Sequence, residues 1–95
     1  MAEITVARGA DVEHFLSRFD VTVTEGTEST HHEVTVSASD FERLGANYTS
    51  PEEFIRACFE FLLEREPKES ILPSFDVAVI GDYYPEFDTR ILRFA

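Results

Sequence analysis

The chain of 95 residues has room for one hydrophobic core, so we expect a single domain over residues 1–95. Hydrophobic residues make up 43% of the chain and include nine Phe, a composition that indicates a globular core and excludes a disordered chain. Nineteen acidic residues against eight basic ones give a net charge of −11, which repels phosphate backbones and anionic membranes. We therefore expect no membrane partner, and nucleic acid is disfavoured.

The N-terminal third of the chain carries two weak signals. Residues 2–7 alternate between apolar and polar side chains, which predicts a short strand that ends before Gly9. Asp11 is a candidate N-cap for a short helix that follows it. The apolar residues with helical spacing in that segment are Val12, Phe15, Leu16 and Phe19.

A β-hairpin is the clearest prediction in this half of the chain. Residues 19–25 alternate strictly, and residues 32–37 alternate in the same way through Val34 and Val36. Between them, residues 26–30 are polar turn formers. Because each strand has a single apolar face, we expect the sheet to be covered on one side only.

Two helices follow the hairpin. Ser39 or Asp40 begins a short helical turn that carries Phe41 and Leu44 and stops at Gly45. The main helix is predicted over residues 51–65, and its N-terminal signals are an N-cap, a proline in the first position and a capping box, from Ser50, Pro51 and Glu53.

Polar side chains occupy only one narrow stripe of the 51–65 helix, so we expect it to be enclosed, either by its own domain or by a second subunit. One apolar group should rest on the sheet: Phe54, Cys58, Phe61 and Leu62. The other group needs a second cover: Ile55, Phe59 and Leu63.

The C-terminal third is predicted to add a strand and a helix. After Pro67 the chain makes a connection over residues 68–73, with room for one helical turn. Residues 75–81 read as a strand covered on both sides, and Pro85 begins a last helix with Phe87, Arg90 and Ile91 on its inner side. These elements predict an α+β domain, in which a small, mostly antiparallel sheet packs against one main amphipathic helix and shorter helices.

No catalytic or metal-binding pattern stands out, and we expect no cofactor. His31 and His32 are neighbours in a strand and must point to opposite faces, while His14 lies far away in sequence. Cys58, the only cysteine, has apolar neighbours on its helix and is expected to be a buried structural thiol.

The most suggestive surface segment is residues 81–87, where Tyr83, Tyr84 and Phe87 surround a proline. Aromatic residues with a polar end are enriched at contact surfaces. The competing interpretation is that these residues close the edge of a small core.

Residues 50–87 resemble a family of small uncharacterised prokaryotic proteins, through SPEEF, FLLEREPKESIL and FDVAVIGDYYPEF. The resemblance implies no activity. It suggests that the segment after the main helix matters beyond packing, with Arg65, Glu66, Lys68, Glu69 and Ser70 as its polar members. The alternative is that these charges form a solvated surface.

We expect a non-enzymatic protein-interaction module, which includes self-association into a homodimer. The alternative is a small-molecule-binding or hydrolytic domain that uses the Arg65–Ser70 segment near Tyr83 and Tyr84. A weaker third possibility is a basic patch for RNA, formed by Arg65, Lys68, Arg90 and Arg93.

The N-terminal segment lacks the basic and apolar regions of a secretion signal, so we expect a cytoplasmic protein. Seven of the eight basic residues are Arg. Excess acid with scarce Lys is typical of proteins adapted to a saline cytoplasm, where salt screens self-repulsion. A GC-rich genome would also replace Lys by Arg, but it explains the acid excess less well.

Overall fold

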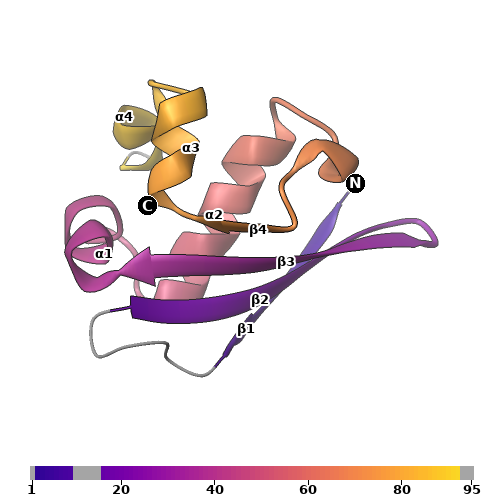
Figure 1. Ribbon diagram of the computed structural model, residues 1–95, viewed down its shortest axis with the longest axis horizontal. Helices are drawn as coiled ribbons and strands as arrows, with labels where there is room; N and C mark the ends of the chain where they lie inside the picture. The colour runs from indigo at the N-terminus through magenta and orange to yellow at the C-terminus, as the bar shows by residue number, and fades with distance from the viewer. Residues whose placement is uncertain (1, 10–15, 93–95) are drawn as a thin grey trace.

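The computed structural model describes residues 2–9 and 16–92 (Figure 1). The expected α+β fold is confirmed. The strands are β1 (Glu3–Arg8), β2 (Leu16–Glu25), β3 (Glu28–Ser37) and β4 (Ser74–Asp76). The helices are α1 (Ala38–Leu44), α2 (Pro51–Leu63), the short 3-10 helix η1 (Lys68–Ser70), α3 (Ala78–Tyr83) and α4 (Phe87–Ile91). Within the described ranges, no helix is long and apolar enough to cross a membrane.

The sheet has the strand order β1-β2-β3-β4, with the first three strands antiparallel and β4 parallel to β3. The predicted strand at residues 2–7 and the hairpin are therefore confirmed. The hairpin turn is tighter than predicted, because Glu25 pairs with Glu28 and leaves only Gly26 and Thr27 in the loop. Gly26 has a φ of 62°, which suits the first central position of a type II′ turn and is a conformation that glycine adopts without strain.

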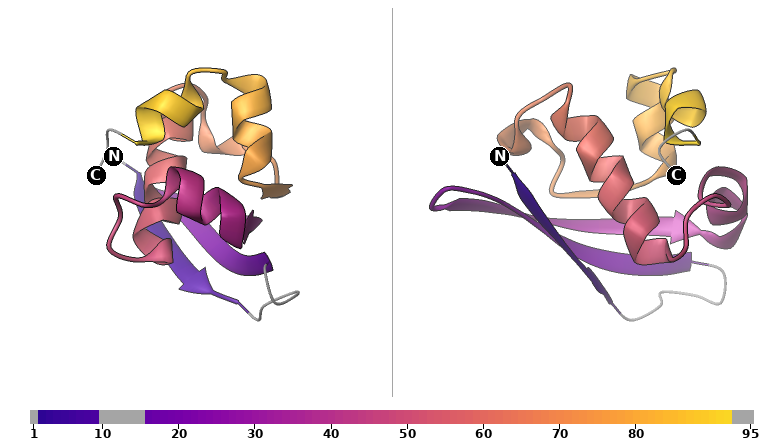
Figure 2. Two further views of the ribbon diagram at one scale, coloured as in Figure 1. Left: turned by 90° about the vertical axis from the view of Figure 1, so that its left-hand side faces the viewer. Right: turned by 180° about the vertical axis from the view of Figure 1, so that it is seen from behind.

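One face of the sheet is buried and the other is polar, as predicted. Figure 2 shows α2 lying across one face of the sheet. On the opposite face the Thr22 hydroxyl lies 3.2 Å from Nδ1 of His31, and the hydroxyls of Thr24 and Ser29 lie 2.9 Å apart. The apolar strand residues buried beneath the helices are Ile4, Phe19, Val21, Val23, Val34 and Val36.

The chain itself encloses α2. The hydroxyl of Ser50 accepts a hydrogen bond from the backbone N–H of Glu53 at 3.2 Å, which confirms the predicted N-cap. The carboxylate of Glu53 accepts a hydrogen bond from the Thr49 hydroxyl. The helix residues that are buried are Phe54, Ile55, Ala57, Cys58, Phe59, Phe61 and Leu62.

The predicted directions of two phenylalanines on α2 are wrong. Phe59 was expected to need a second cover, but its ring centroid lies 5.3 Å from that of His32 on β3 and 5.9 Å from that of Phe75 on β4. Phe61 was expected to rest on the sheet, but its ring contacts Tyr84 and Phe87. The reason is that β4 extends the sheet beyond β3, whereas the α3–α4 segment covers the opposite side of α2.

The predicted strand over residues 75–81 is also wrong beyond its first two residues. β4 ends at Asp76 and lies at the edge of the described sheet, and the chain then turns into α3. The carboxylate of Asp76 accepts hydrogen bonds from the Thr35 hydroxyl at 2.7 Å and from the backbone N–H of Ala78 at 3.0 Å, and so helps the chain to turn. Val77 and Ile80 are both buried, and their spacing of three residues fits a helix as well as the alternation fits a strand.

The remaining differences concern element boundaries. α1 begins at Ala38, because the Ser37 hydroxyl caps it by accepting a hydrogen bond from the Asp40 N–H at 3.1 Å. α4 begins at Phe87, two residues after Pro85, and it buries Phe87 and Ile91 but leaves Arg90 exposed, contrary to expectation.

Most of the predicted Asp11 helix, with Val12, Phe15 and His14, lies outside the described residues, and Leu16 and Phe19 belong to β2. One helical turn after Pro67 is confirmed by η1.

Candidate functional site

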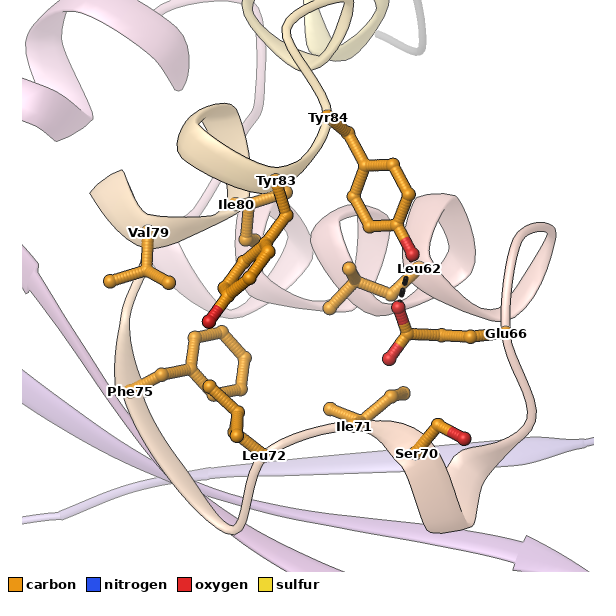
Figure 3. A pocket seen from close by; sticks show the side chains of 10 residues that line it. All are labelled: Leu62, Glu66, Ser70, Ile71, Leu72, Phe75, Val79, Ile80, Tyr83 and Tyr84. Carbon is orange, nitrogen blue, oxygen red and sulfur yellow. Dashed lines mark hydrogen bonds between the residues drawn. The ribbon is translucent and has the colours of Figure 1, made fainter.

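A pocket of about 230 Å³ lies between the C-terminal end of α2, the η1–β4 segment and α3 (Figure 3). Three successive segments within residues 62–84 therefore build it. Its apolar lining consists of Leu62, Ile71, Leu72, Phe75, Val79 and Ile80.

The polar lining of the pocket is small and contains one charged group. It consists of Glu66, Ser70, Tyr83 and Tyr84. The Tyr84 hydroxyl donates a hydrogen bond to Oε2 of Glu66, and this bond raises the pKa of Tyr84, so that the phenol keeps its proton. The other oxygen of Glu66, Oε1, has no hydrogen-bond partner among the described residues.

Two large hydrophobic side chains, one of them a tyrosine, remain exposed at the pocket. Tyr83 is 67% exposed and Leu72 is 44% exposed. Within the described part of the chain, Leu92 is the one other large hydrophobic residue that is exposed, at 38%, and it does not line the pocket. The exposed apolar surface of the described residues is therefore concentrated at this pocket.

A buried histidine holds the wall that carries Leu72. Nδ1 of His32 lies 2.8 Å from the carbonyl oxygen of Leu72, so this nitrogen donates, and Nε2 lies 2.9 Å from the hydroxyl of Thr30. Both ring nitrogens are therefore occupied within the protein. His31 points to the opposite face of the sheet, as predicted, and no group of metal-ligating side chains occurs among the described residues.

Lys68 and Glu69 lie away from the pocket, next to the hairpin turn. The Lys68 side chain is only 3% exposed. Its Nζ lies 2.5 Å from a carboxylate oxygen of Glu69 and 3.6 Å from a carboxylate oxygen of both Glu25 and Glu28. The hydrogen bond between Lys68 and Glu69 raises the pKa of the lysine and lowers the pKa of the carboxyl group. These ion pairs connect η1 to the hairpin, and the residues directly after η1 form part of the pocket wall.

Arg65 and Phe87 both contact Phe61, and neither of them lines the pocket. The guanidinium of Arg65 stacks on the Phe61 ring at 3.6 Å from its centroid, lies 5.9 Å from the Tyr84 ring, and pairs with Glu86 at 3.1 Å. Phe87 is completely buried against Phe61. Of the polar and aromatic residues singled out in the sequence, the structure thus brings Glu66, Ser70, Tyr83 and Tyr84 together in the pocket.

The proposed RNA patch is not assembled by the described residues. The guanidinium groups of Arg65 and Arg90 lie 3.3 and 3.8 Å from Oε1 of Glu64. Lys68 is buried beside the hairpin instead. Arg93 lies outside the described residues.

The thiol of Cys58 is fully buried, as predicted, and burial raises its pKa. A buried thiol that keeps its proton at neutral pH is a poor nucleophile. The sequence reasoning did not identify Leu72 and Phe75 as site residues, because apolar residues in a connection and a strand carry no local sign of facing a pocket.

No protein family, curated protein or solved structure matches the chain.

Proposed function

We propose that the protein is a non-enzymatic interaction module that binds a partner protein through this pocket. The observation that carries the proposal is the position of Leu72 and Tyr83, which are both exposed and both line the same pocket. Burying exposed apolar surface contributes roughly 25 cal/mol per Å² removed from water, and tyrosine is among the residues that most often dominate a protein interface.

The size of the pocket favours a single side chain as its occupant. Pockets for complete small-molecule ligands measure about 300–1,000 Å³, whereas a cavity of about 150 Å³ holds one benzene molecule. The pocket measures about 230 Å³ and lies between these values. One anchoring side chain of a partner protein fits this volume.

The alternative of a small-molecule or hydrolytic site keeps one observation in its favour, the Glu66–Tyr84 pair in the pocket wall. A hydrolytic site also needs an activated nucleophile or water. Ser70 is the only pocket hydroxyl besides the tyrosines, and it has no side-chain hydrogen bond to a base among the described residues. The geometry therefore supports binding better than catalysis.

The test is a capture experiment with cell extract from the source organism. The bait proteins are the wild type, the double variant Leu72→Ser/Tyr83→Ser, and Leu92→Ser as a matched control, because Leu92 is exposed outside the pocket. Circular dichroism establishes that each bait is folded.

We expect a partner that the wild type and Leu92→Ser retain and the double variant loses. Capture that does not depend on Leu72 and Tyr83, or no capture at all, would contradict the proposal. If the partner is a second copy of the chain, sedimentation equilibrium will show a wild-type dimer that the double variant does not form.

A further inference from the structure

We propose that the group bound in the pocket is a lysine side chain of the partner, that is, an ammonium group carried on an alkyl chain. This inference rests on the proposed function, because it concerns the same pocket.

Among the described residues, three aromatic rings and one carboxylate line the pocket. Figure 3 shows the rings of Phe75 and Tyr83 on one side of the pocket, and Tyr84 with Glu66 on the other side. The face of an aromatic ring attracts a cation, and clustered rings are a known way to recognise alkylated ammonium groups. A carboxylate beside the rings adds a charge that an ammonium group can pair with. A neutral apolar occupant would leave the carboxylate without a partner for its second oxygen.

The single free oxygen of Glu66 favours one of the two basic side chains, lysine and arginine, over the other. Oε2 already accepts the hydrogen bond from Tyr84, which leaves Oε1 as the acceptor for an incoming group. A guanidinium group binds best to two parallel acceptors, whereas an ammonium group is a compact charge that needs only one. The geometry therefore favours lysine over arginine.

The protein does not supply this cation from its own described residues. Arg65 stacks on Phe61 and pairs with Glu86, and Lys68 is buried among three carboxylates. Neither of them lines the pocket. The net charge of −11 attracts a basic partner and repels an acidic one.

The apolar wall suits the stem of a lysine. Leu62, Ile71 and Ile80 are buried residues of the lining and offer an apolar surface beside Glu66. Lysine commonly lays its methylene chain along apolar surface while its charged end reaches a polar partner. The pocket of about 230 Å³ accommodates such a chain but no large ligand.

The test is a titration followed by nuclear magnetic resonance of the full chain, with the signals of Ile71, Ile80 and Tyr83 as reporters. The probes are N-acetyl-lysine N-methylamide, its arginine counterpart, the neutral norleucine counterpart and n-butylammonium. We expect the lysine probe to bind about tenfold more tightly than the norleucine probe, which lacks the charge. We also expect it to bind more tightly than the arginine probe.

Two charge variants sharpen the result. Glu66→Gln keeps an oxygen for the Tyr84 hydroxyl but removes the charge, and should weaken lysine binding about tenfold. Glu42→Gln, on the exposed surface of α1, removes the same charge outside the pocket and should leave the affinity nearly unchanged.

Several outcomes would overturn the inference. They are equal binding of the norleucine probe, reporter signals that do not move with lysine, and stronger binding of n-butylammonium, which would indicate a free amine as the ligand. Partner capture that needs Leu72 and Tyr83 but not the Glu66 charge would overturn the lysine inference and leave the proposed function standing. Capture that is independent of all three residues would reject the proposed function itself.

Discussion

The helix α2 and the pocket at its C-terminal end differ in how their side chains are used. Seven residues of α2 are buried and hold the domain together. The pocket shares buried residues such as Leu62 with the core, but two of its lining side chains, Leu72 and Tyr83, face solvent. The difference teaches that the strongest apolar pattern in this sequence indicates packing, whereas the candidate site is distinguished by exposed side chains that lie outside that pattern.

If this comparison holds, substitutions in α2 will change stability and substitutions in the pocket will change binding. The largest expected effect comes from Phe59→Ala. Phe59 is fully buried between His32 and Phe75, so its truncation should lower the free energy of unfolding by about 3–5 kcal/mol.

Urea denaturation at several protein concentrations measures this loss. A loss that is the same at each concentration indicates an intramolecular cover. A loss that varies with concentration, or no loss, would show that the cover of Phe59 is different from the one described here.

A smaller effect is expected from Lys68→Met. The variant leaves Glu25, Glu28 and Glu69 close together without their common cation, so the melting temperature at neutral pH should fall. Lys68→Arg is the control that keeps the charge. A melting temperature equal to that of the wild type would show that the cluster does not stabilise the domain.

The same cluster predicts a pH dependence. The folded-state pKa of Glu69 is lowered, so its contribution to stability is present above the unfolded-state value of 4.5 and is lost as the pH falls through the folded-state pKa. The folded-state pKa of Lys68 is raised, so its contribution is present below 10.5 and is lost at higher pH. The melting temperature, measured across both pH ranges, should therefore change less with pH for Lys68→Met than for the wild type.

The net charge of −11 predicts that added salt stabilises the whole domain by screening the repulsion between its acids. The melting temperature should rise as potassium chloride goes from low to molar concentration. Sucrose is the control, because it favours the compact state without screening charge. An unchanged melting temperature in salt would leave the GC-rich genome as the better explanation of the composition.

The smallest effect on stability is expected from Tyr83→Ala. Tyr83 is 67% exposed, so the free energy of unfolding should change by less than about 0.5 kcal/mol. Binding of the partner should nevertheless be lost. A large loss of stability would show that Tyr83 belongs to the core and would remove the contrast between the two regions.

The local sequence pattern was sufficient to predict an element wherever that element depends on residues close together in the chain. The alternation of residues 19–25 and 32–37 predicted the hairpin, because a half-buried strand must place its apolar residues on one face. Ser50 and Pro51 predicted where α2 begins, because capping satisfies backbone groups within the same few residues. Tyr83 and Tyr84 were predicted as candidate contact residues from their chemistry, whereas Glu66 was singled out by the resemblance of its segment to a family.

The tertiary structure decided what the sequence left ambiguous. Val77 and Ile80 fit either a strand or a helix, and the hydrogen bond between Thr35 and Asp76, 41 residues apart, ends β4 where α3 can begin. The directions of Phe59 and Phe61 depended on where β4 and α4 pack, which no local spacing encodes. The sequence by itself determined one largely apolar helix and a one-sided sheet, because apolar periodicity and capping are encoded in neighbouring residues. The pocket was decided by the tertiary structure, because it exists only where three separate segments meet.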